Sequence, residues 1–283
     1  MIVWVRVPIP APNTNMETDM KNDDLENRMK KYEYVTRTHL VPRCPVIIRL
    51  DGKSFHTFTR GFKKPFDKVF LDTMQETMKY LCEHIQGCVL GYTQSDEITL
   101  VLIDYMKLNS DSWFDYNIQK CASVSASMAT MAFNKIFLQK IELLLARECS
   151  GEQYTTYELA AHKGAMFDAR AFNIPKEEVC NNILWRQNDA VRNSILSLGL
   201  AHFSHSILKD KSCSEIKDLL FKEKGINWND LKTRFQRGSC CVKRPTNNTS
   251  GGVMRMKWFI DNEIPIFKGD GRKYIDDLIF VGE

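Results

Sequence analysis

The order in which strand-like and helix-like apolar patterns follow one another constrains the fold of this chain more than any other feature. A β-branched run precedes a stretch with helical spacing, two short apolar runs joined by a tight turn, a stretch without Gly or Pro, and a last extended run. These segments are, in order, residues 46–50, 66–85, 88–93, 97–103, 117–138 and 164–175. The order strand, helix, strand, strand, helix, strand predicts an α+β protein with ferredoxin-like βαββαβ topology.

The remaining sequence predicts additional helices and a hairpin. Helices are expected from about 176 to 206 and from 212 to 224, a hairpin around "KGDGRKY" in the tail, and a loop at "TNNTSGG", residues 246–252. With 283 residues, 43% of them hydrophobic, the chain is long enough to bury a core of its own. We divide it into three predicted parts: a disordered N-terminal extension (1–24), a core (25–175), and a helical and β-hairpin part packed on that core (176–283).

Composition excludes several classes of protein. The nine cysteines are scattered, and the only close pair is Cys240 and Cys241, so neither a zinc-binding spacing nor the framework of a small secreted domain is present. The N-terminal "MIVWVRVPIPAPN" is too short and too rich in Pro and Arg to span a membrane. A cytoplasmic protein with reduced thiols and no membrane partner is expected.

Three acidic residues lie where this topology brings strand ends together. Asp51 ends the first strand, and Asp96 and Glu97 lie at the turn into the third strand, which is adjacent to the first in a ferredoxin-like sheet. Three converging carboxylates repel one another unless a cation neutralises them, and oxygen ligands without His or Cys favour magnesium over zinc. Two magnesium ions held by aspartates stabilise in-line displacement at phosphorus, so nucleotidyl transfer is the leading chemistry.

The residues after Asp51 suggest a phosphate site. Gly52 allows backbone groups to approach a ligand, and the amides of residues 53–56 are placed to bind phosphate oxygens. The basic residues Lys53, Lys63 and Lys64 would add positive charge, whereas His56 is expected to pack locally between its phenylalanine neighbours. Taken alone, each motif favours the simpler explanation, a plain turn at residues 51–52 or solvated hairpin acids, but their combination at these topological positions favours a site.

Four segments in fixed order resemble the tRNA-His guanylyltransferase superfamily. They are "RLDGKSFHTFTRGFKKPFD", "GYTQSDEITLVL", "FDARAF" and "LWRQNDAVRNS", and the resemblance covers roughly residues 25–245. It implies a polymerase-palm core with additional helices and a basic C-terminal extension. It also implies a magnesium-dependent enzyme that adds nucleotides to the 5′ end of RNA, in the 3′-to-5′ direction, and that assembles as a homotetramer.

The resemblance also implies roles for individual residues. Metal ligands would be Asp51, the carbonyl of Gly52 and Asp96, with Glu97 assisting catalysis. A nucleoside triphosphate would be bound by Asp51, Gly52, Lys53, Ser54, Phe55, His56, Lys64, Ser95 and Asp96. A second triphosphate or the RNA 5′ end would face Arg49, Lys120, Arg170 and Asn193.

One departure from the eukaryotic pattern affects the expected reaction. Where eukaryotic members carry His-Ile-Asn, this chain reads Val191-Arg192-Asn193 and lacks the histidine, as do the bacterial, archaeal and some protist guanylyltransferase-like proteins. The resemblance therefore implies templated repair of truncated tRNA 5′ ends, with ATP activating a 5′-monophosphate and other nucleoside triphosphates as substrates. Untemplated addition of G to tRNA-His is the alternative.

Two other hypotheses use the same topology, and a basic segment bears on one of them. Residues 222–244 hold seven Lys or Arg against two acids, which suggests an RNA surface, although Trp228 within it is expected to pack internally. A non-catalytic ferredoxin-like RNA-binding module would display aromatic residues on its central strands, and the third strand, "ITLVL", has none. A nucleotide cyclase would share the carboxylates and metals but would act without RNA.

Overall fold

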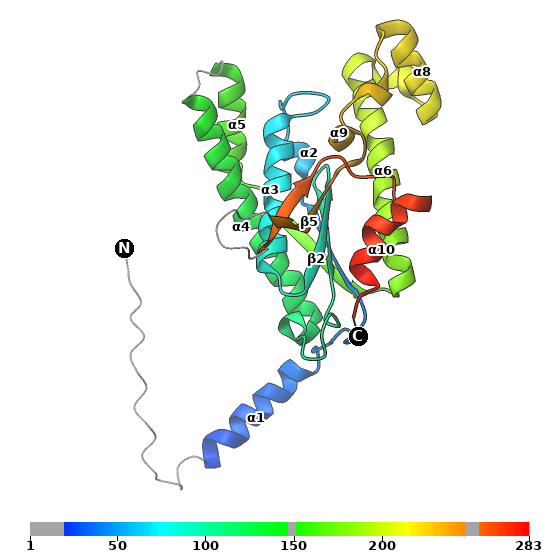
Figure 1. Cartoon of the computed structure of the whole chain (residues 1–283). Coiled ribbons are helices and arrows are strands. Elements are labelled where there is room, and N and C mark those ends of the chain that lie inside the picture. Colours follow the sequence, from blue (N-terminus) through cyan, green and yellow to red (C-terminus); the bar gives the residue numbers. More distant parts are fainter. Residues whose placement is uncertain (1–19, 147–150, 247–254, 283) are drawn as a thin grey trace. The chain divides into compact units, whose positions relative to one another are not determined.

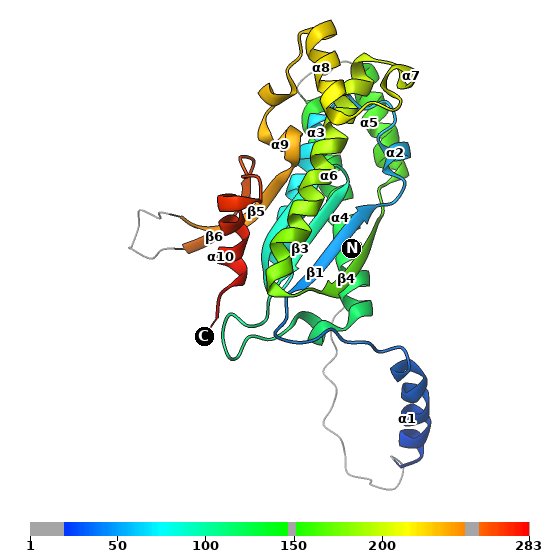
Figure 2. The ribbon, with the colours of Figure 1, turned by 90° about the vertical axis from the view of Figure 1, so that its right-hand side faces the viewer.

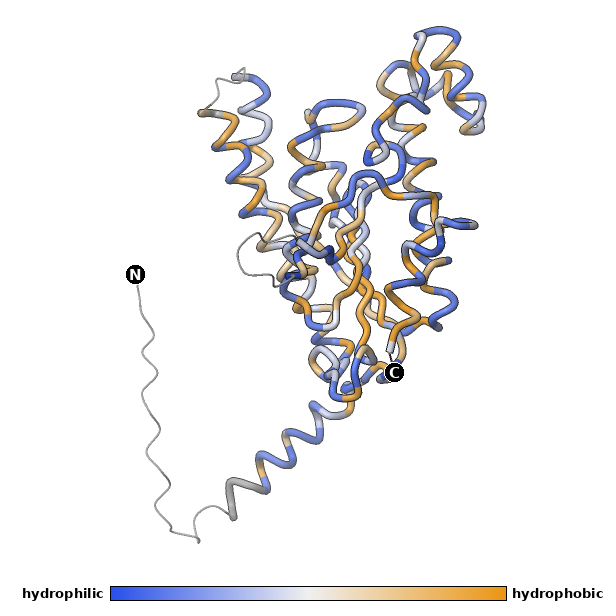
Figure 3. The backbone as a smooth tube through the Cα atoms, viewed as in Figure 1, coloured by the Kyte–Doolittle hydropathy of each residue, from blue (hydrophilic) through white to orange (hydrophobic). Residues whose placement is uncertain are grey.

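The computed structural model describes residues 20–146, 151–246 and 255–282. Residues 247–252 of the predicted loop lie outside these ranges, as do residues 1–19 of the predicted extension. The chain divides into two compact units, one ending at Thr38 and one from His39 to Glu283. The described part of the first unit contains α1 (Met20–Tyr34), a mostly hydrophilic helix (Figure 3), so residues 20–24 of the predicted extension are helical.

Within the described residues, the second unit contains one six-stranded antiparallel sheet (Figure 1). Its strands are β1 (Val46–Gly52), β2 (Cys88–Gln94), β3 (Glu97–Leu102), β4 (Phe167–Asn173), β5 (Ser239–Thr246) and β6 (Arg255–Asp261). The spatial order is β4-β1-β3-β2-β5-β6. The first four strands have the order of the ferredoxin-like fold, which confirms the predicted topology, and β5 with β6 extends the sheet beyond β2.

Helices cover both faces of this sheet (Figure 2). The described α-helices of this unit are α2 (Phe55–Phe58), α3 (Lys68–His84), α4 (Ile118–Leu145), α5 (Gly151–Lys163), α6 (Lys176–His202), α7 (His205–Leu208), α8 (Cys213–Lys224), α9 (Thr233–Arg237) and α10 (Lys273–Ile279). Short 3-10 turns form η1 (Trp113–Tyr116), η2 (Trp228–Asp230) and η3 (Gly269–Arg272). One core lies between the sheet and α3 with α4, and a second between the sheet and α6 with α10.

Strand β1 contributes to both cores because its side chains alternate between the two faces. Val46, Ile48 and Leu50 are buried in the core beneath α3 and α4, whereas Ile47 is buried in the core beneath α6. Arg49 shares the face of Ile47, as the sequence alternation predicted. The polar positions of β1 therefore lie on the α6 side of the sheet.

Aromatic rings fill the core between α4 and the end of the sheet. The ring of Phe133 is fully buried, and its centroid lies 5.4 Å from that of Phe55, 5.5 Å from that of Phe58 and 5.5 Å from that of Phe167. Phe55 and Phe58 belong to the segment that directly follows β1. This aromatic cluster therefore packs against the segment that follows Asp51 and holds it in place.

The predicted hairpin around "KGDGRKY" is wrong. Those residues form η3 and the start of α10, and the hairpin of the C-terminal part is made by β5 and β6 instead. Ile275 and Ile279 are four residues apart and fully buried, so one face of a helix fills the second core there. Gly271 is required by close backbone approach, since a Cβ atom would lie 2.0 Å from the carbonyl oxygen of Ile266.

Several predicted helices change length or were missed. α4 continues to Leu145 beyond the predicted end at 138, and the helix expected to reach 206 ends at His202. α5 was not predicted because only Tyr157 and Ala160 of its residues are buried, which leaves a weak apolar period. None of the described helices combines the length and the apolar character needed to cross a bilayer.

Truncating the central aromatic ring tests the support given to the segment after β1. Phe133→Ala is expected to lower the free energy of unfolding by about 3–5 kcal/mol, because it removes a fully buried ring. Urea titration followed by circular dichroism measures the change. Phe221→Ala, at a ring that is 62% exposed, is the control and should leave the unfolding free energy nearly unchanged. Equal losses in both variants would contradict this account of the core.

Candidate active site

The end of β1 and the turn between β2 and β3 meet at one end of the sheet. Asp51 pairs with Glu97 across β1 and β3, and the amide of Gly52 donates to the carbonyl oxygen of Asp96 over 3.1 Å. The predicted proximity of these segments is confirmed. Because this hydrogen bond joins Gly52, which follows Asp51, to Asp96, which precedes Glu97, the two acidic segments are held in a fixed register.

Two serines beside these acids have left-handed backbone conformations. Ser54 has φ 56° and Ser95 has φ 49°, a region that costs a non-glycine residue roughly 1–2 kcal/mol. Ser54 begins the short helix α2, and Ser95 lies in the tight turn between β2 and β3. Strain of this kind gathers at functional sites, where surrounding packing maintains it.

The strained segments line a cavity of about 370 Å³. Its lining residues are Gly52, Ser54, Phe55, His56, Thr59, Phe70, Ser95 and Asp96, which brings together most of the predicted nucleotide-binding set. Lys64 lines an adjoining cavity of about 280 Å³ that shares Ser95. His56 is exposed, so the expectation that it packs between its phenylalanine neighbours is wrong. Its position beside a cavity fits ligand contact better than core packing.

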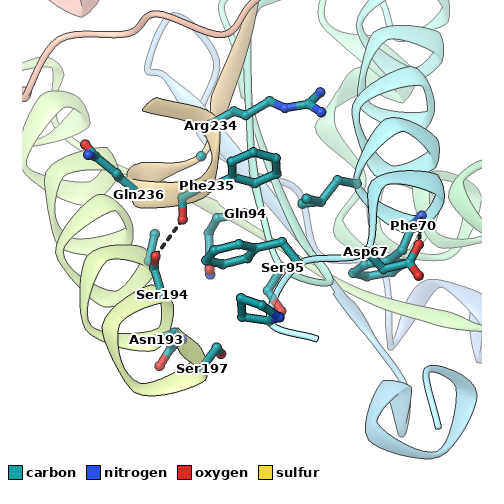
Figure 4. A pocket seen from close by; sticks show the side chains of 15 residues that line it. Asp67, Phe70, Gln94, Ser95, Asn193, Ser194, Ser197, Arg234, Phe235 and Gln236 are labelled. Carbon is teal, nitrogen blue, oxygen red and sulfur yellow. Dashed lines mark hydrogen bonds between the residues drawn. The ribbon is translucent and has the colours of Figure 1, made fainter. Parts of the chain in front are cut away.

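A third cavity of about 120 Å³ also reaches Ser95 (Figure 4). Asn193 of α6 and Phe235 of α9 line it from two other elements, and the ring of Phe235 stacks on that of Phe66 with centroids 5.0 Å apart. Ser95 is therefore a shared wall of these adjoining cavities. The structure places Asn193 near the predicted nucleotide-binding residues although it lies almost one hundred positions later in the sequence.

Glycine at position 52 is required by internal packing. A Cβ atom there would lie 2.3 Å from the ring of Phe55, and that ring is held by the aromatic cluster around Phe133. The predicted amide cradle is smaller than expected, because the amide of Lys53 donates to the carbonyl oxygen of Met166 over 2.9 Å. Among the described residues, the amides of Ser54 to His56 donate no hydrogen bond and remain available for a ligand.

Asp96 carries an electrostatic penalty in the folded protein. Burial raises the pKa of its carboxyl, and the negative charge of Asp51 raises it further, whereas a hydrogen bond from the Ser95 hydroxyl at 3.0 Å acts in the opposite direction. Two carboxylates that repel each other beside a cavity are a fitting donor set for a hard cation. Asp51, Asp96 and the backbone oxygen of Gly52 are the groups here that suit magnesium.

The third predicted carboxylate is used differently. Glu97 is buried and forms an ion pair with the guanidinium of Arg186 at 2.7 Å, and Arg186 also contacts Asp189 at 2.8 Å. Burial raises the pKa of the Glu97 carboxyl, while the charges of Arg186 and Arg49 oppose that shift. Within the described ranges no three acidic, histidine or cysteine side chains are grouped to hold a metal. An arginine of α6 thus compensates the charge of Glu97, which leaves Asp51 and Asp96 as the carboxylates predicted to bind metal.

Like charges face each other in two neighbouring rows of the β1–β4 ladder. Asp51 lies opposite Asp168, and two residues back along β1, Arg49 lies opposite Arg170. Paired like charges destabilise a sheet unless something between them compensates. Asp168 was not predicted as a site residue, because its pairing with Asp51 depends on a strand register that sequence alone does not give.

Lys120 is the predicted site residue that the structure does not bring to this end of the sheet. Lys120 lies in the first turn of α4, and its ammonium lies 5.7 Å from the ring of Phe114 in η1. The residue of α4 that lies beside the end of β1 is Thr130. Its hydroxyl accepts a hydrogen bond from the amide of Phe167, which pairs with Gly52 across β4 and β1. Ten helical residues separate the two positions, about 15 Å along the axis.

Comparison with known proteins decides the family. The family model described as tRNAHis guanylyltransferase matches residues 26–175. The chain belongs to this family. A bacterial tRNA(His) guanylyltransferase (Thg1)-like protein solved in complex with ATP is 38% identical, with a TM-score of 0.76 over 91% of this chain and 99% of that chain. The same kind of bacterial protein solved with GTP is 37% identical, with a TM-score of 0.75 over 92% and 100% of the two chains.

Curated relatives agree with this assignment to the tRNAHis guanylyltransferase family. The tRNA(His) guanylyltransferase of Schizosaccharomyces pombe is 28% identical over 230 residues, which cover 77% of this chain and 79% of the relative. Guanylyl transfer is nucleotidyl transfer, so the predicted class of enzyme is confirmed and the non-catalytic RNA-binding module is disfavoured. The bacterial Thg1-like structures confirm the palm-like α+β fold.

The raised pKa of the Asp96 carboxyl predicts a pH-dependent difference in stability. A carboxyl with a higher pKa in the folded than in the unfolded state binds its proton more tightly when folded, so stability falls as pH rises through that range. Asp96→Asn avoids this loss. Without divalent cations, we expect the variant to melt above the wild type near pH 8 and to approach it near pH 4, the ordinary carboxyl range.

Differential scanning calorimetry at both pH values measures this difference. Asp218→Asn, at an exposed carboxylate of α8, is the matched control and should show no such pH-dependent gain. An Asp96→Asn variant that melts below the wild type near pH 8 would contradict the electrostatic account.

Proposed function

We propose that this protein repairs tRNA 5′ ends by template-dependent addition of nucleotides in the 3′-to-5′ direction. The observation that carries the proposal is the meeting of Asp51 and Asp96 beside a cavity at the end of the central strands. Neither carboxylate forms an ion pair with a basic side chain in the described parts of the chain, so both are available for cations. This is the donor arrangement that displacement at phosphorus requires.

The cavity around Ser54 and Ser95 is proposed to hold a nucleoside triphosphate. Free amides at the start of α2 and the exposed side chains of Lys53, His56 and Lys64 offer donors and positive charge to its phosphates. The similar bacterial structures were solved in complex with ATP and with GTP, which supports the same class of substrate here.

Asp51, Asp96 and the carbonyl oxygen of Gly52 are the proposed ligands of two magnesium ions. When bound, magnesium would stabilise charge on the attacking and leaving oxygens. The chain contributes by holding both carboxylates in register through the hydrogen bond between Gly52 and Asp96. Glu97 assists indirectly, because its ion pair with Arg186 fixes the first residue of β3 to α6.

The proposed reaction consists of two displacements at phosphorus. First, a 5′-monophosphate oxygen of the RNA attacks the α-phosphorus of ATP, which releases pyrophosphate and leaves an adenylylated 5′ end. Next, the 3′ hydroxyl of the incoming nucleotide attacks the phosphorus of that RNA end, which releases AMP. An RNA with a 5′-triphosphate omits the first displacement and releases pyrophosphate in the second. Arg49 and Arg170 are proposed to bind the second triphosphate or the RNA 5′ phosphates.

Templated repair is preferred to untemplated addition of G because of the residues near Asn193. Val191 stands where eukaryotic members carry histidine, and Asn193 lines a cavity shared with Ser95. Untemplated addition to tRNA-His is the second candidate. A homotetramer and a cytoplasmic location complete the proposal, the latter supported by free thiols at all eight described cysteines.

Product length tests the proposed reaction. The wild type, incubated with magnesium, ATP, all four nucleoside triphosphates and a labelled tRNA that lacks its first 5′ nucleotide, is expected to extend the RNA by the complementary nucleotide. Asp51→Ala with Asp96→Ala should abolish extension, since both carboxylates are lost, while RNA binding persists. Changing the template base opposite the missing nucleotide should change the nucleotide added.

Two outcomes of this assay would count against the proposal. Addition of G whatever the template base would favour the untemplated reaction. Nucleotide consumed without any change in RNA length would favour a cyclase. Asp218→Asn with Asp111→Asn, at two exposed carboxylates outside the cavity, serves as the matched control.

The RNA-contacting surface is proposed to include the ribbon formed by the ends of β5 and β6. The predicted basic segment 222–244 is only partly available, because Arg234 pairs with Asp72 at 2.9 Å and Arg237 donates to the carbonyl oxygen of Ile264. Trp228 is buried and donates to the Ser194 hydroxyl, which confirms that it packs internally. Beyond residue 242, β5 pairs with β6 alone. These ends of β5 and β6 project from the rest of the sheet (Figure 2).

Charge along this ribbon suits a polyanion. Lys243, Arg244, Arg255 and Lys257 are exposed, and Arg244 lies directly opposite Lys257. Lys243 and Arg244 contact the rings of Trp258 and Phe259 at 5.0 and 4.9 Å. A sheet tolerates opposed like charges more readily when phosphates lie against them.

Salt dependence of RNA binding tests the ribbon. Arg255→Gln with Lys257→Gln is expected to weaken tRNA binding and to lower the slope of log K against log salt by roughly two, about one for each phosphate that is no longer neutralised. Filter binding over a salt series measures the slope. Lys209→Gln with Lys211→Gln, which removes the same charge elsewhere, should leave the slope nearly unchanged. Equal slopes for the ribbon variant and the wild type would exclude the ribbon as a phosphate-binding surface.

A further inference from the structure

Trp185 is an exposed aromatic residue among charged neighbours. Its side chain belongs to α6 and is 53% exposed, whereas Trp113 and Trp228 are 7% and 8% exposed. The guanidinium of Arg49 lies 5.6 Å from the Trp185 ring, and that of Arg186 lies 4.4 Å from it. We propose that Trp185 is the stacking platform for a nucleobase whose 5′ phosphates lie on Arg49 and Arg170. The inference rests on the proposed function and assigns a residue to it.

The basic row beside Trp185 is only weakly balanced by acidic side chains. Arg49 and Arg170 are directly opposed across β1 and β4, and Arg49 forms no ion pair within the described ranges. The one ion pair of Arg170 in those ranges is with Asp168 at 4.0 Å, and both side chains are more than half exposed. Opposed guanidinium groups are unfavourable until an anion lies between or above them.

The orientation of this row relative to the acidic pair fits a nucleotide. Arg49 and Asp51 are two strand residues apart on the same face, about 7 Å along β1. Phosphates bound on the basic row would thus lie beside the carboxylate of Asp51, and a base attached to them would reach the Trp185 ring, which already contacts Arg49. A ligand that combines a flat π system with phosphates matches all three groups.

Arg186 holds the platform in place. It is buried, and its ion pairs with Glu97 and Asp189 fix the guanidinium against which the Trp185 ring rests. An indole fixed before the ligand arrives loses little conformational freedom on binding, which favours affinity. Arginines flank the exposed ring, so this position suits a nucleobase with phosphates better than an apolar protein surface.

Fluorescence and kinetics test the proposal with the full-length protein. The difference in tryptophan emission between the wild type and Trp185→Phe isolates the signal of Trp185. We expect that signal to be quenched by GTP or by 5′-phosphorylated RNA, but not by inorganic tripolyphosphate, which has phosphates and no base. Trp185→Leu should raise the KM for the base-bearing ligand about ten-fold, the effect of losing one stacked base, with kcat changed much less. Trp185→Phe should stay near the wild type because it retains a ring.

The kinetic measurement uses a 5′-triphosphorylated RNA so that activation by ATP is not required. A raised KM for the nucleoside triphosphate identifies the incoming nucleotide as the stacked ligand, and a raised KM for the RNA identifies the terminal nucleotide instead. Unchanged KM values for both in Trp185→Leu, or quenching by tripolyphosphate alone, would overturn the platform. Arg170→Gln should weaken binding of tripolyphosphate and GTP alike. Quenching by GTP in a protein that extends no RNA would refute the proposed function and leave the stacking site standing.

Discussion

The position of β1 between β3 and β4 is the constraint on which the rest of the site depends. Pairing on both edges fixes the register of the strand, and a shift of one residue would turn Asp51 into the apolar core. The chain must also turn tightly after β1, because the ring of Phe55 packs directly over Gly52. Core packing beneath α4 thus determines where the backbone after Asp51 lies. Apolar contacts on the face of the sheet covered by α3 and α4 therefore determine the geometry of the site.

The buried ion pair between Arg186 and Glu97 links the C-terminal helices to this arrangement. Removing one partner of such a pair typically costs about 3–5 kcal/mol, because the other charge is left buried without compensation. α6 is therefore tied to the first residue of β3, immediately after Asp96. Asn193 lies about two helical turns further along α6 and lines a cavity with Ser95. The C-terminal part consequently completes the site, and it shares one compact unit with the core.

Much of the fold follows from local patterns, whereas the finer contacts of the site do not. The strand and helix periods and the βαββαβ order were sufficient to place Asp51 beside Asp96, because that topology fixes which strands are neighbours. The partner of Glu97 lies 89 residues away, and the charges of "WRQND" have the spacing of any solvated helix face. The glycines of "KGDGRKY" indicated a turn, yet the buried isoleucines that follow required a helix. Contacts between residues far apart in the sequence decide both outcomes, and the periodicity of the sequence carries no information about such contacts.

The two like-charged rows of the β1–β4 ladder have a common physical logic. Asp51 with Asp168 repels anions and attracts cations, and Arg49 with Arg170, two residues away along β1, does the reverse. Like charges repel within each row, and the exposed ion pair between Asp168 and Arg170 relieves this repulsion only in part. The left-handed backbone of Ser54 adds further strain. A nucleotide bound with magnesium carries phosphates and cations at neighbouring positions, so it would offset both rows at once. Such a ligand would stabilise the folded chain by binding, because the rows exist as neighbours only in the folded state. Affinity would then depend on both rows together, since neutralising one alone leaves the repulsion in the other.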